Sequence, residues 1–306
     1  MPKKSKLAEE SDKNPAKLKP VRKASGKVVY LRRTPTELSD RILGKELIVD
    51  KLALRNVPIL FDSSNELGLD MKFVDGIRQR RSAKLPNGAK IHLGKLRIGR
   101  DDSEHPDLVA VEVRIEFNPS RVVFLNRLDG DIYVDQLPAA LDALTRFLES
   151  CGVVVDFQDL RVRVQRIDFA RDFLLGDTPA TAVIESQFYD IDRPRAPKGH
   201  MYRKQRLGEP VEGFQLSSTN YRAKVYDLKR RHGPEVASDL RFEFSITKSR
   251  YGRYWDFRDL DKVTPSEAGR VVEHHFDRLR FGARTEYGYL DLHKGKLLPI
   301  PSLALV

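Results

Sequence analysis

Two carboxylates on one face of an expected strand are the first residues here whose types and spacing suggest chemistry. Alternation through residues 162–173 places Asp168 and Asp172 on one face and apolar residues such as Phe169 on the other. The two acids would lie about 7 Å apart along the strand. Hard divalent cations take oxygen ligands from rigid elements, so the pattern is consistent with half of a metal site. Taken alone, a half-buried strand whose acids pair with nearby arginines is the favoured explanation.

Two further expected strands carry a carboxylate at a position that a half-buried sheet would shield from water. Glu243 lies between Phe242 and Phe244, which face the other way, and Glu116 lies near the end of its strand. A carboxylate there is costly to desolvate unless a cation or an arginine compensates it. Three strands with this pattern indicate a shared acidic site that includes Asp168, with separate ion pairs as the alternative.

Tyr226 is a candidate nucleophile because it lies among basic residues, with Lys224 on its own strand face. A tyrosine hydroxyl with a pKa near 10 is a poor nucleophile, but adjacent cations or a metal favour the phenolate. Packing beside solvated basic residues is the alternative, and the residue types alone favour it. The common enzyme signatures GxxxxGK[ST], GxSxG and HExxH do not occur in the sequence.

Composition favours a polyanionic partner, since the 306 residues carry a net charge of +11 and the isoelectric point is near 9.6. The first 28 residues hold nine Lys or Arg against three acids, so they supply +6 of this charge and are expected to be disordered. The single cysteine, Cys151, excludes an intramolecular disulfide and a cysteine zinc cage. No apolar run reaches the roughly 18–20 residues of a membrane span, and no signal peptide is recognised. A cytoplasmic protein without membrane contact is expected.

These candidate residues lie on elements that predict an α+β fold with a mainly antiparallel central sheet and flanking helices. Strands are expected at 46–55 (closed by Val57-Pro58), 90–98, 108–117, 162–173, 214–219, 221–229 and 240–248. Helices are expected at 135–152 (capped by Asp135), 178–188, 249–260 and 264–280.

Four blocks in this order resemble a known family: VRIEFNPSR, RIDFARDF, YRAKVYDLK and LRFEFSITKSRYGRYWDF. Through them the chain resembles the Rep_trans family of rolling-circle plasmid replication initiators and, more distantly, the filamentous-phage initiators. The resemblance covers roughly residues 46–260. It implies a relaxase- or nickase-like domain over 29–262, after the 1–28 basic tail and before a C-terminal helix and tail of unassigned role over 263–306.

The family resemblance implies an enzyme that binds origin DNA and nicks one strand by metal-dependent transesterification. A tyrosine forms a 5′-phosphotyrosine link and frees a 3′-hydroxyl, and the enzyme rejoins DNA at termination. Tyr226 matches the family's R-x-Y-x-K tyrosine block, with Lys224 and Asp227 where members often have arginine and asparagine. Asp168 and Glu243 match the acids that bind Mg²⁺ or Mn²⁺ in the family, and Glu116 is a weaker match.

The partner expected from the resemblance is plasmid or phage origin DNA, single-stranded at the nick, in the bacterial cytoplasm. The residues expected to contact DNA are Arg166, Lys224, Lys229, Arg230 and Arg241. A host helicase and a second copy of the chain, in a homodimer, are further expected partners. Two alternatives stay open: a non-catalytic DNA-binding regulator on the same fold, and an RNA-binding protein that stacks bases on Tyr251, Tyr254 and Trp255.

Overall fold

The computed structural model describes residues 20–22, 28–30, 45–61, 82–84, 89–93, 111–124, 130–150, 153–189, 198–203, 211–252, 254–281 and 284–299. The chain divides into two compact units, Met1–Thr36 and Glu37–Val306. In the first unit, β1 (Pro20–Arg22) and β2 (Val28–Tyr30) form an antiparallel hairpin. Part of the segment expected to be disordered is therefore a strand. Residues 1–19 and 23–27 lie outside the described residues, and disorder there stays a prediction.

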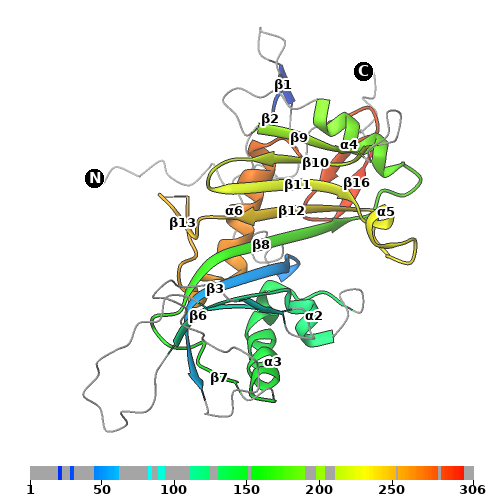
Figure 1. The fold of residues 1–306 in the computed structure, drawn as a ribbon. Helices are drawn as coiled ribbons and strands as arrows, with labels where there is room; N and C mark the ends of the chain where they lie inside the picture. Colours follow the sequence, from blue (N-terminus) through cyan, green and yellow to red (C-terminus); the bar gives the residue numbers. More distant parts are fainter. Residues whose placement is uncertain are drawn as a thin grey trace, which may run out of the picture. The chain divides into compact units, whose positions relative to one another are not determined.

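The second unit is built on one sheet of ten strands in which every neighbouring pair is antiparallel (Figure 1). The strand order is β4-β5-β6-β3-β8-β12-β11-β10-β9, and β7 pairs with β3 off this path. The bounds are β3 Ile48–Phe61, β4 Ser82–Lys84, β5 Lys90–Leu93, β6 Val111–Phe117, β7 Val153–Val155, β8 Arg163–Phe173, β9 Lys198–Arg203, β10 Val211–Ser217, β11 Tyr221–Asp227 and β12 Leu240–Ile246. The expected α+β class with an antiparallel sheet is confirmed.

Helices and two small hairpins surround this sheet. The helices are α2 Pro119–Phe124, α3 Leu137–Ser150, α4 Ala180–Tyr189, α5 Leu228–His232 and α6 Pro265–Arg278, with 3-10 turns η1 Val134–Gln136 and η2 Leu260–Lys262. The hairpins pair β13 (Arg250–Tyr251) with β14 (Trp255–Asp256) and β15 (Tyr289–Asp291) with β16 (Lys296–Leu298). None of the described helices is long and apolar enough to cross a membrane.

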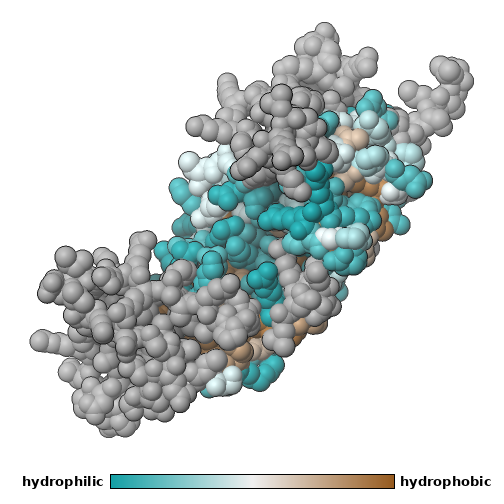
Figure 2. Space-filling view, turned by 45° about the vertical axis from the view of Figure 1, so that its right-hand side comes forward, coloured by the Kyte–Doolittle hydropathy of each residue, from teal (hydrophilic) through white to brown (hydrophobic). Residues whose placement is uncertain are grey.

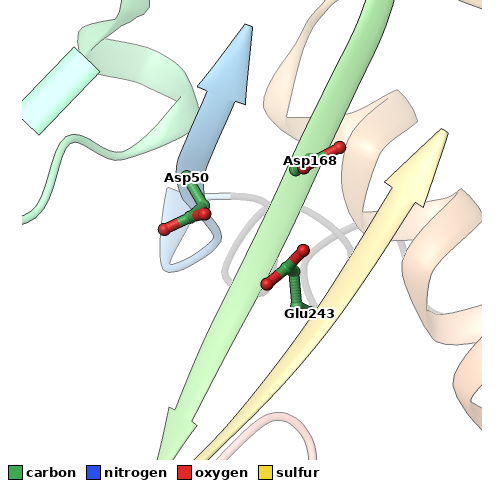
Figure 3. Close-up of side chains that lie close together, drawn as sticks. All are labelled: Asp50, Asp168 and Glu243. Atoms are coloured by element: carbon green, nitrogen blue, oxygen red, sulfur yellow. The ribbon is translucent and has the colours of Figure 1, made fainter. Parts of the chain in front are cut away.

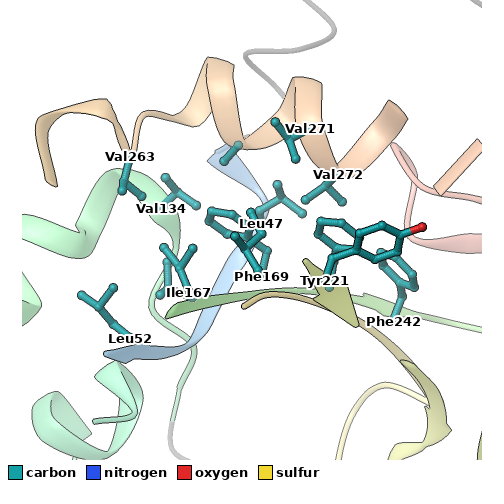
Figure 4. Packing of buried hydrophobic residues seen from close by; sticks show 14 of the residues in the cluster. Leu47, Leu52, Val134, Ile167, Phe169, Tyr221, Phe242, Val263, Val271 and Val272 are labelled. Carbon is teal, nitrogen blue, oxygen red and sulfur yellow. The ribbon is translucent and has the colours of Figure 1, made fainter. Parts of the chain in front are cut away.

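Helix α6 covers one face of the sheet and buries its apolar stripe against it (Figure 4). Its N-cap is Thr264, at the start of the helix expected over 264–280, and the Thr264 side chain accepts a hydrogen bond from the Glu267 amide at 3.3 Å. Phe276 meets Phe242 of β12 edge to face, with ring centroids 5.1 Å apart. The core therefore includes α6, and the division expected after residue 262 is not a division of the core.

Strand β3 does not close at Val57-Pro58, as predicted, but continues to Phe61. Its pairing with β8 ends at Arg55 and its pairing with β7 begins at Ile59. Pro58 thus falls where one edge of β3 has no partner among the described strands. A missing N–H on that edge costs no ladder hydrogen bond, and prolines within sheets are confined to such positions.

The prediction of a helix over 249–260 is wrong, because this segment contains the β13–β14 hairpin. Gly252 has a φ of 51°, a left-handed conformation that glycine adopts without strain. The Trp255 ring is buried, and its Nε1 donates to the Lys248 carbonyl at 2.8 Å. Asp135 also differs from the prediction, since it lies inside η1 rather than at the cap of α3.

Candidate metal centre

Three buried carboxylates from three adjacent strands converge on the sheet face opposite α6. They are Asp50 of β3, Asp168 of β8 and Glu243 of β12, and one carboxylate oxygen of each lies within 4.8 Å of the others (Figure 3). The opposite face follows from alternation, since the neighbouring Phe169 packs in the core. Three converging carboxylates are a donor set that fits Mg²⁺ or Mn²⁺. The structure thus brings Asp168 and Glu243 together and adds Asp50, which the sequence analysis missed.

A β-bulge explains why Asp50 was missed. Strict alternation puts Asp50 on the same face as Leu52, which is in the hydrophobic core. In the structure Val49 pairs with Phe169 and Lys51 with Asp168, so Asp50 is the extra residue of a bulge. A bulge re-aims a side chain, and here the Asp50 carboxylate reaches the acidic face. The only signal in the sequence was an acid inside the apolar run ELIVDKLALR.

The turn before α2 holds this bulge in place. The Asn118 side chain donates from Nδ2 to the Asp50 carbonyl at 2.5 Å, and its Oδ1 accepts from the Arg121 amide at 3.0 Å. One side chain therefore both starts α2 and fixes the backbone of Asp50. The asparagine of the VRIEFNPSR block therefore stabilises the backbone next to the three carboxylates.

Asp168 is only 1% exposed and is held by a bidentate arginine. Arg166 donates from Nε to Oδ1 at 2.8 Å and from Nη2 to Oδ2 at 2.5 Å. Burial raises the pKa of Asp168, Arg166 lowers it without cancelling this effect, and the charges of Glu243 and Asp50 raise it further. Arg166 therefore does not fully offset the cost of burying the ionised Asp168 carboxylate, and additional positive charge would stabilise it.

Glu243 is held by the residue opposite it on β11. The ammonium of Lys224 lies 2.5 Å from Glu243 Oε1, and the Ser245 hydroxyl donates to the same oxygen at 3.2 Å. The Lys224 and Arg166 charges are thus both bound to carboxylates of the group of three. Both residues were predicted to contact DNA.

Arg241 is buried and bound to carboxylates on three sides. It forms two hydrogen bonds to Asp172, at 2.5 and 2.8 Å, and contacts Asp50 at 3.2 Å and Asp131 at 3.4 Å. Burial works to lower its pKa, but the hydrogen bond and charge of Asp172 outweigh this and the pKa lies well above its usual value. A guanidinium enclosed in this way positions Asp50. Arg241 was predicted to contact DNA, and in the structure acids occupy its guanidinium.

Tyr226 lies beside the carboxylate group on the same sheet face. It is paired across the ladder with Arg241, and Lys224, two residues earlier, is paired with Glu243. Diagonal neighbours on one face are about 7–8 Å apart at Cα, so Tyr226 is a near neighbour of Glu243. Its ring is buried, and the Arg231 guanidinium carbon lies 4.6 Å above the ring centroid.

Glu116 is not in the group of three. Its carboxylate pairs with Lys51 at 3.3 Å and with Arg114 at 2.8 Å. Burial would raise its pKa, but the charges of Lys51 and Arg114 outweigh burial and lower it. The weaker candidate ligand is thus already neutralised by two cations, Lys51 of the neighbouring β3 and Arg114 of its own strand β6.

Two further residues that were predicted to contact DNA lie around α5 and are engaged in surface ion pairs. Lys229 contacts Asp239 at 2.5 Å, and Arg230 contacts Glu212 at 3.1 Å. Pairs as accessible as these exchange readily with solvent. Both cations therefore remain compatible with a phosphate contact.

The aromatic residues considered as an RNA-stacking platform pack on one another. Tyr251 stacks on Tyr254 with centroids 5.1 Å apart and leans on the buried Trp255 at 5.0 Å. Both tyrosines are half-buried against the core. Core packing accounts for these three residues.

Comparison with known proteins finds a match among solved structures, and that match is weak. No family model matches the chain, and no curated protein matches it. A solved structure of a rolling circle replication initiator protein from Geobacillus stearothermophilus is similar over 67% of this chain and 75% of that chain. The identity is 15% and the TM-score is 0.34, values at which similarity does not assign a function.

Proposed function

We propose that this protein is a metal-dependent DNA-nicking enzyme that initiates rolling-circle replication. The observation that carries the proposal is the convergence of Asp50, Asp168 and Glu243 on a sheet face beside Tyr226. A buried group of three carboxylates next to a tyrosine suits transfer of a phosphoryl group to that tyrosine. The four sequence blocks that resemble Rep_trans initiators supply the substrate class, origin DNA that is single-stranded at the nick.

In the proposed reaction the Tyr226 oxygen attacks a backbone phosphorus and the bond from phosphorus to the 3′-oxygen breaks. The products are a 5′-phosphotyrosine link and a 3′-hydroxyl, and the reverse reaction rejoins DNA. A divalent cation held by the three carboxylates would act as Lewis acid on the scissile phosphate. Arg231 lies over the tyrosine ring and Arg241 is paired with Tyr226 across the ladder, so their charges would stabilise negative charge on the tyrosine oxygen. Since Arg231 lies over the ring, the strand has to approach past this exposed side chain.

The experiment is a nicking assay on supercoiled plasmid that carries a candidate origin, with Mg²⁺ or Mn²⁺. The wild-type protein should convert circles to nicked or relaxed forms and give a covalent protein–DNA band on a denaturing gel. Tyr226→Phe removes one oxygen, so DNA binding should persist while the covalent band disappears. Tyr251→Phe, at a half-buried tyrosine, is the matched control and should still form the band. A covalent band from Tyr226→Phe, absent from Tyr251→Phe, would move the assignment to Tyr251.

The second candidate function is a non-catalytic DNA-binding regulator on the same fold. The observation in its favour is that Arg166, Lys224 and Arg241 already compensate the three carboxylates. The same assay separates the two functions, since a regulator would bind the plasmid without nicking it in either metal. The host helicase and the homodimer expected from the resemblance stay predictions.

A further inference from the structure

The cations on the acidic face of the sheet fall into two classes. Arg166 and Lys224 are each bound to a carboxylate of the candidate metal centre. Arg222, two residues before Lys224, is paired in the ladder with Ser217 on one side and Ser245 on the other. Within the described part of the chain its guanidinium has no hydrogen bond or ion pair. Arg166 and Lys224 are therefore each held by an acid of the candidate metal centre, as the buried Arg241 is by Asp50, whereas Arg222 has no such partner among the described residues.

We propose that a divalent cation and a single-stranded DNA backbone bind this site cooperatively, because the metal displaces Arg166 and Lys224 from their carboxylates and frees them for phosphates. The inference rests on the proposed function in one respect: it needs the metal to bind at Asp50, Asp168 and Glu243. It adds a coupling between metal and DNA that the nicking chemistry does not require.

The displacement follows from competition for the same oxygens. Arg166 occupies both oxygens of Asp168, at 2.8 and 2.5 Å, and Lys224 lies 2.5 Å from one oxygen of Glu243. A coordinated divalent ion would lie about 2–2.6 Å from these oxygens. Its double charge would then be only a few ångströms from a guanidinium and an ammonium, and their mutual repulsion weakens both ion pairs. Metal and side-chain cations therefore exclude one another.

The released side chains can reach a ligand on this face. The side chains of Arg166 and Lys224 are 24% and 17% exposed, so they lie at the surface of the site rather than beneath it. Arg241 is not released, because its side chain is 6% exposed and Asp172 holds it with two hydrogen bonds. The described part of the molecular surface seen in Figure 2 is mostly hydrophilic. Two cations thus become available per metal bound.

The consequence is a measurable change in salt dependence. Each phosphate neutralised on a single strand adds about 0.7 to the slope of log affinity against log salt. Release of Arg166 and Lys224 should therefore steepen the slope by about 1.4 when the metal is bound. Linkage also requires that DNA raise the affinity for the metal by the same factor by which the metal raises the affinity for DNA.

The test uses the full-length Tyr226→Phe protein, which binds without cleaving, and a fluorescein-labelled oligothymidylate. Anisotropy titrations over a series of NaCl concentrations are run in EDTA and in MgCl₂ at matched ionic strength. We expect tighter binding and a slope steeper by about 1.4 in MgCl₂. An equal or shallower slope in MgCl₂ would overturn the proposal.

Variants of the acids and of the cations report on the exchange separately. Asp168→Asn in the same background frees Arg166 without any metal, so its affinity for the oligonucleotide in EDTA should exceed that of the parent. Arg166→Gln should reduce the salt slope only in MgCl₂. The matched control is Arg222→Gln, which removes a cation without a partner among the described residues and should reduce the slope equally in both buffers. Circular dichroism confirms that each variant is folded.

Direct metal binding separates failure of the coupling from failure of the proposed function. Calorimetric titration with Mn²⁺ should show one site that Glu243→Gln abolishes. If Mn²⁺ binds there while the DNA slope is unchanged, the coupling is wrong and the nicking enzyme stands. If no Mn²⁺ binds, both the coupling and the metal centre of the proposed function are wrong.

Discussion

At the scale of single residues, burial decides how much each ion pair of this protein contributes. Arg241 and its partner Asp172 have side chains only 6% and 18% exposed, whereas Lys229 is 44% exposed beside Asp239. Removing one member of a buried pair leaves a charge that water cannot solvate, while an exposed partner is simply rehydrated. Two cations that are equivalent in the sequence therefore have very different effects on stability.

Arg241→Gln should lower the free energy of unfolding by about 3–5 kcal/mol, because Asp172 and Asp50 lose their buried counter-charge. Lys229→Gln, the control at an exposed pair, should lower it by less than about 1 kcal/mol. Urea denaturation followed by circular dichroism measures both. Equal, small losses in the two variants would show that Arg241 is not needed to compensate the acids.

His275 predicts a pH dependence of stability. It is 1% exposed between the rings of Tyr221 and Phe244, neither ring nitrogen has a hydrogen-bond partner among the described residues, and burial lowers its pKa to about 3. At a pH between about 3 and 6.5, the His275 imidazole is protonated in the unfolded chain, where its pKa is near 6.5, but stays neutral in the folded chain. This contribution to stability is complete above pH 6.5 and is lost at up to about 1.4 kcal/mol per pH unit as the pH falls toward 3.

The measurement is the free energy of unfolding of wild type and His275→Phe between pH 7.5 and pH 5. His275→Phe keeps an aromatic ring in the site and removes the titrating group. The wild type should lose stability more steeply than the variant on acidification. Parallel curves would mean that the buried imidazole takes up its proton without cost.

At the scale of elements, the candidate metal centre depends on how β3 meets β8. The bulge at Asp50 is the feature that brings a third carboxylate to Asp168 and Glu243. Asn118 holds the bulge with its amide nitrogen and starts α2 with its amide oxygen. The two tasks use different atoms, so two substitutions can separate them.

Asn118→Asp retains an oxygen for the Arg121 amide but loses the donor to the Asp50 carbonyl. Asn118→Ala loses both. Both variants should bind Mn²⁺ more weakly in calorimetry, because the Asp50 backbone is no longer held, and Asn118→Ala should lose about 1 kcal/mol more stability through the missing cap. Unchanged Mn²⁺ affinity in both variants would show that Asn118 does not position Asp50.

At the scale of the whole Glu37–Val306 unit, the acidic face and the apolar face of the sheet depend on each other. The apolar face carries Phe169 and Phe242 under α6, whose Val272 and Phe276 are buried with them (Figure 4). Residues after 278 return to the sheet as well, since Leu174 and Lys296 form a bridge between backbones. The strands that hold the carboxylates thus have their other side covered by the C-terminal part of the chain.

A chain truncated after residue 262 should therefore fail to fold, although the family resemblance ends near residue 260. It exposes a row of phenylalanines, and each large aromatic side chain removed from the core costs about 3–5 kcal/mol. We expect insoluble protein, or a soluble chain without a cooperative urea transition. A cooperatively folded 1–262 fragment would show that the sheet is stable without α6.

Elements whose signal lies in neighbouring residues could be predicted from the sequence. Alternation placed the strands of Asp168 and Glu243 and set their carboxylates opposite the phenylalanines, and Thr264-Pro265 marked the start of α6. These patterns are readable because side-chain direction in a strand or helix is a local property of the backbone. The confirmed α+β class follows from them.

Which of these charged side chains contact one another could not be predicted from the sequence and became visible in the folded sheet. Asp50 joins the carboxylates through a bulge, Glu116 is neutralised by Lys51 and Arg114, and Arg241 is enclosed by acids. The segment expected as a helix over 249–260 contains the β13–β14 hairpin, whose tryptophan is buried in the core. Bulges, registers and ion pairs depend on which strands lie side by side. The alternation of apolar and polar residues within one strand does not specify which strands lie beside it.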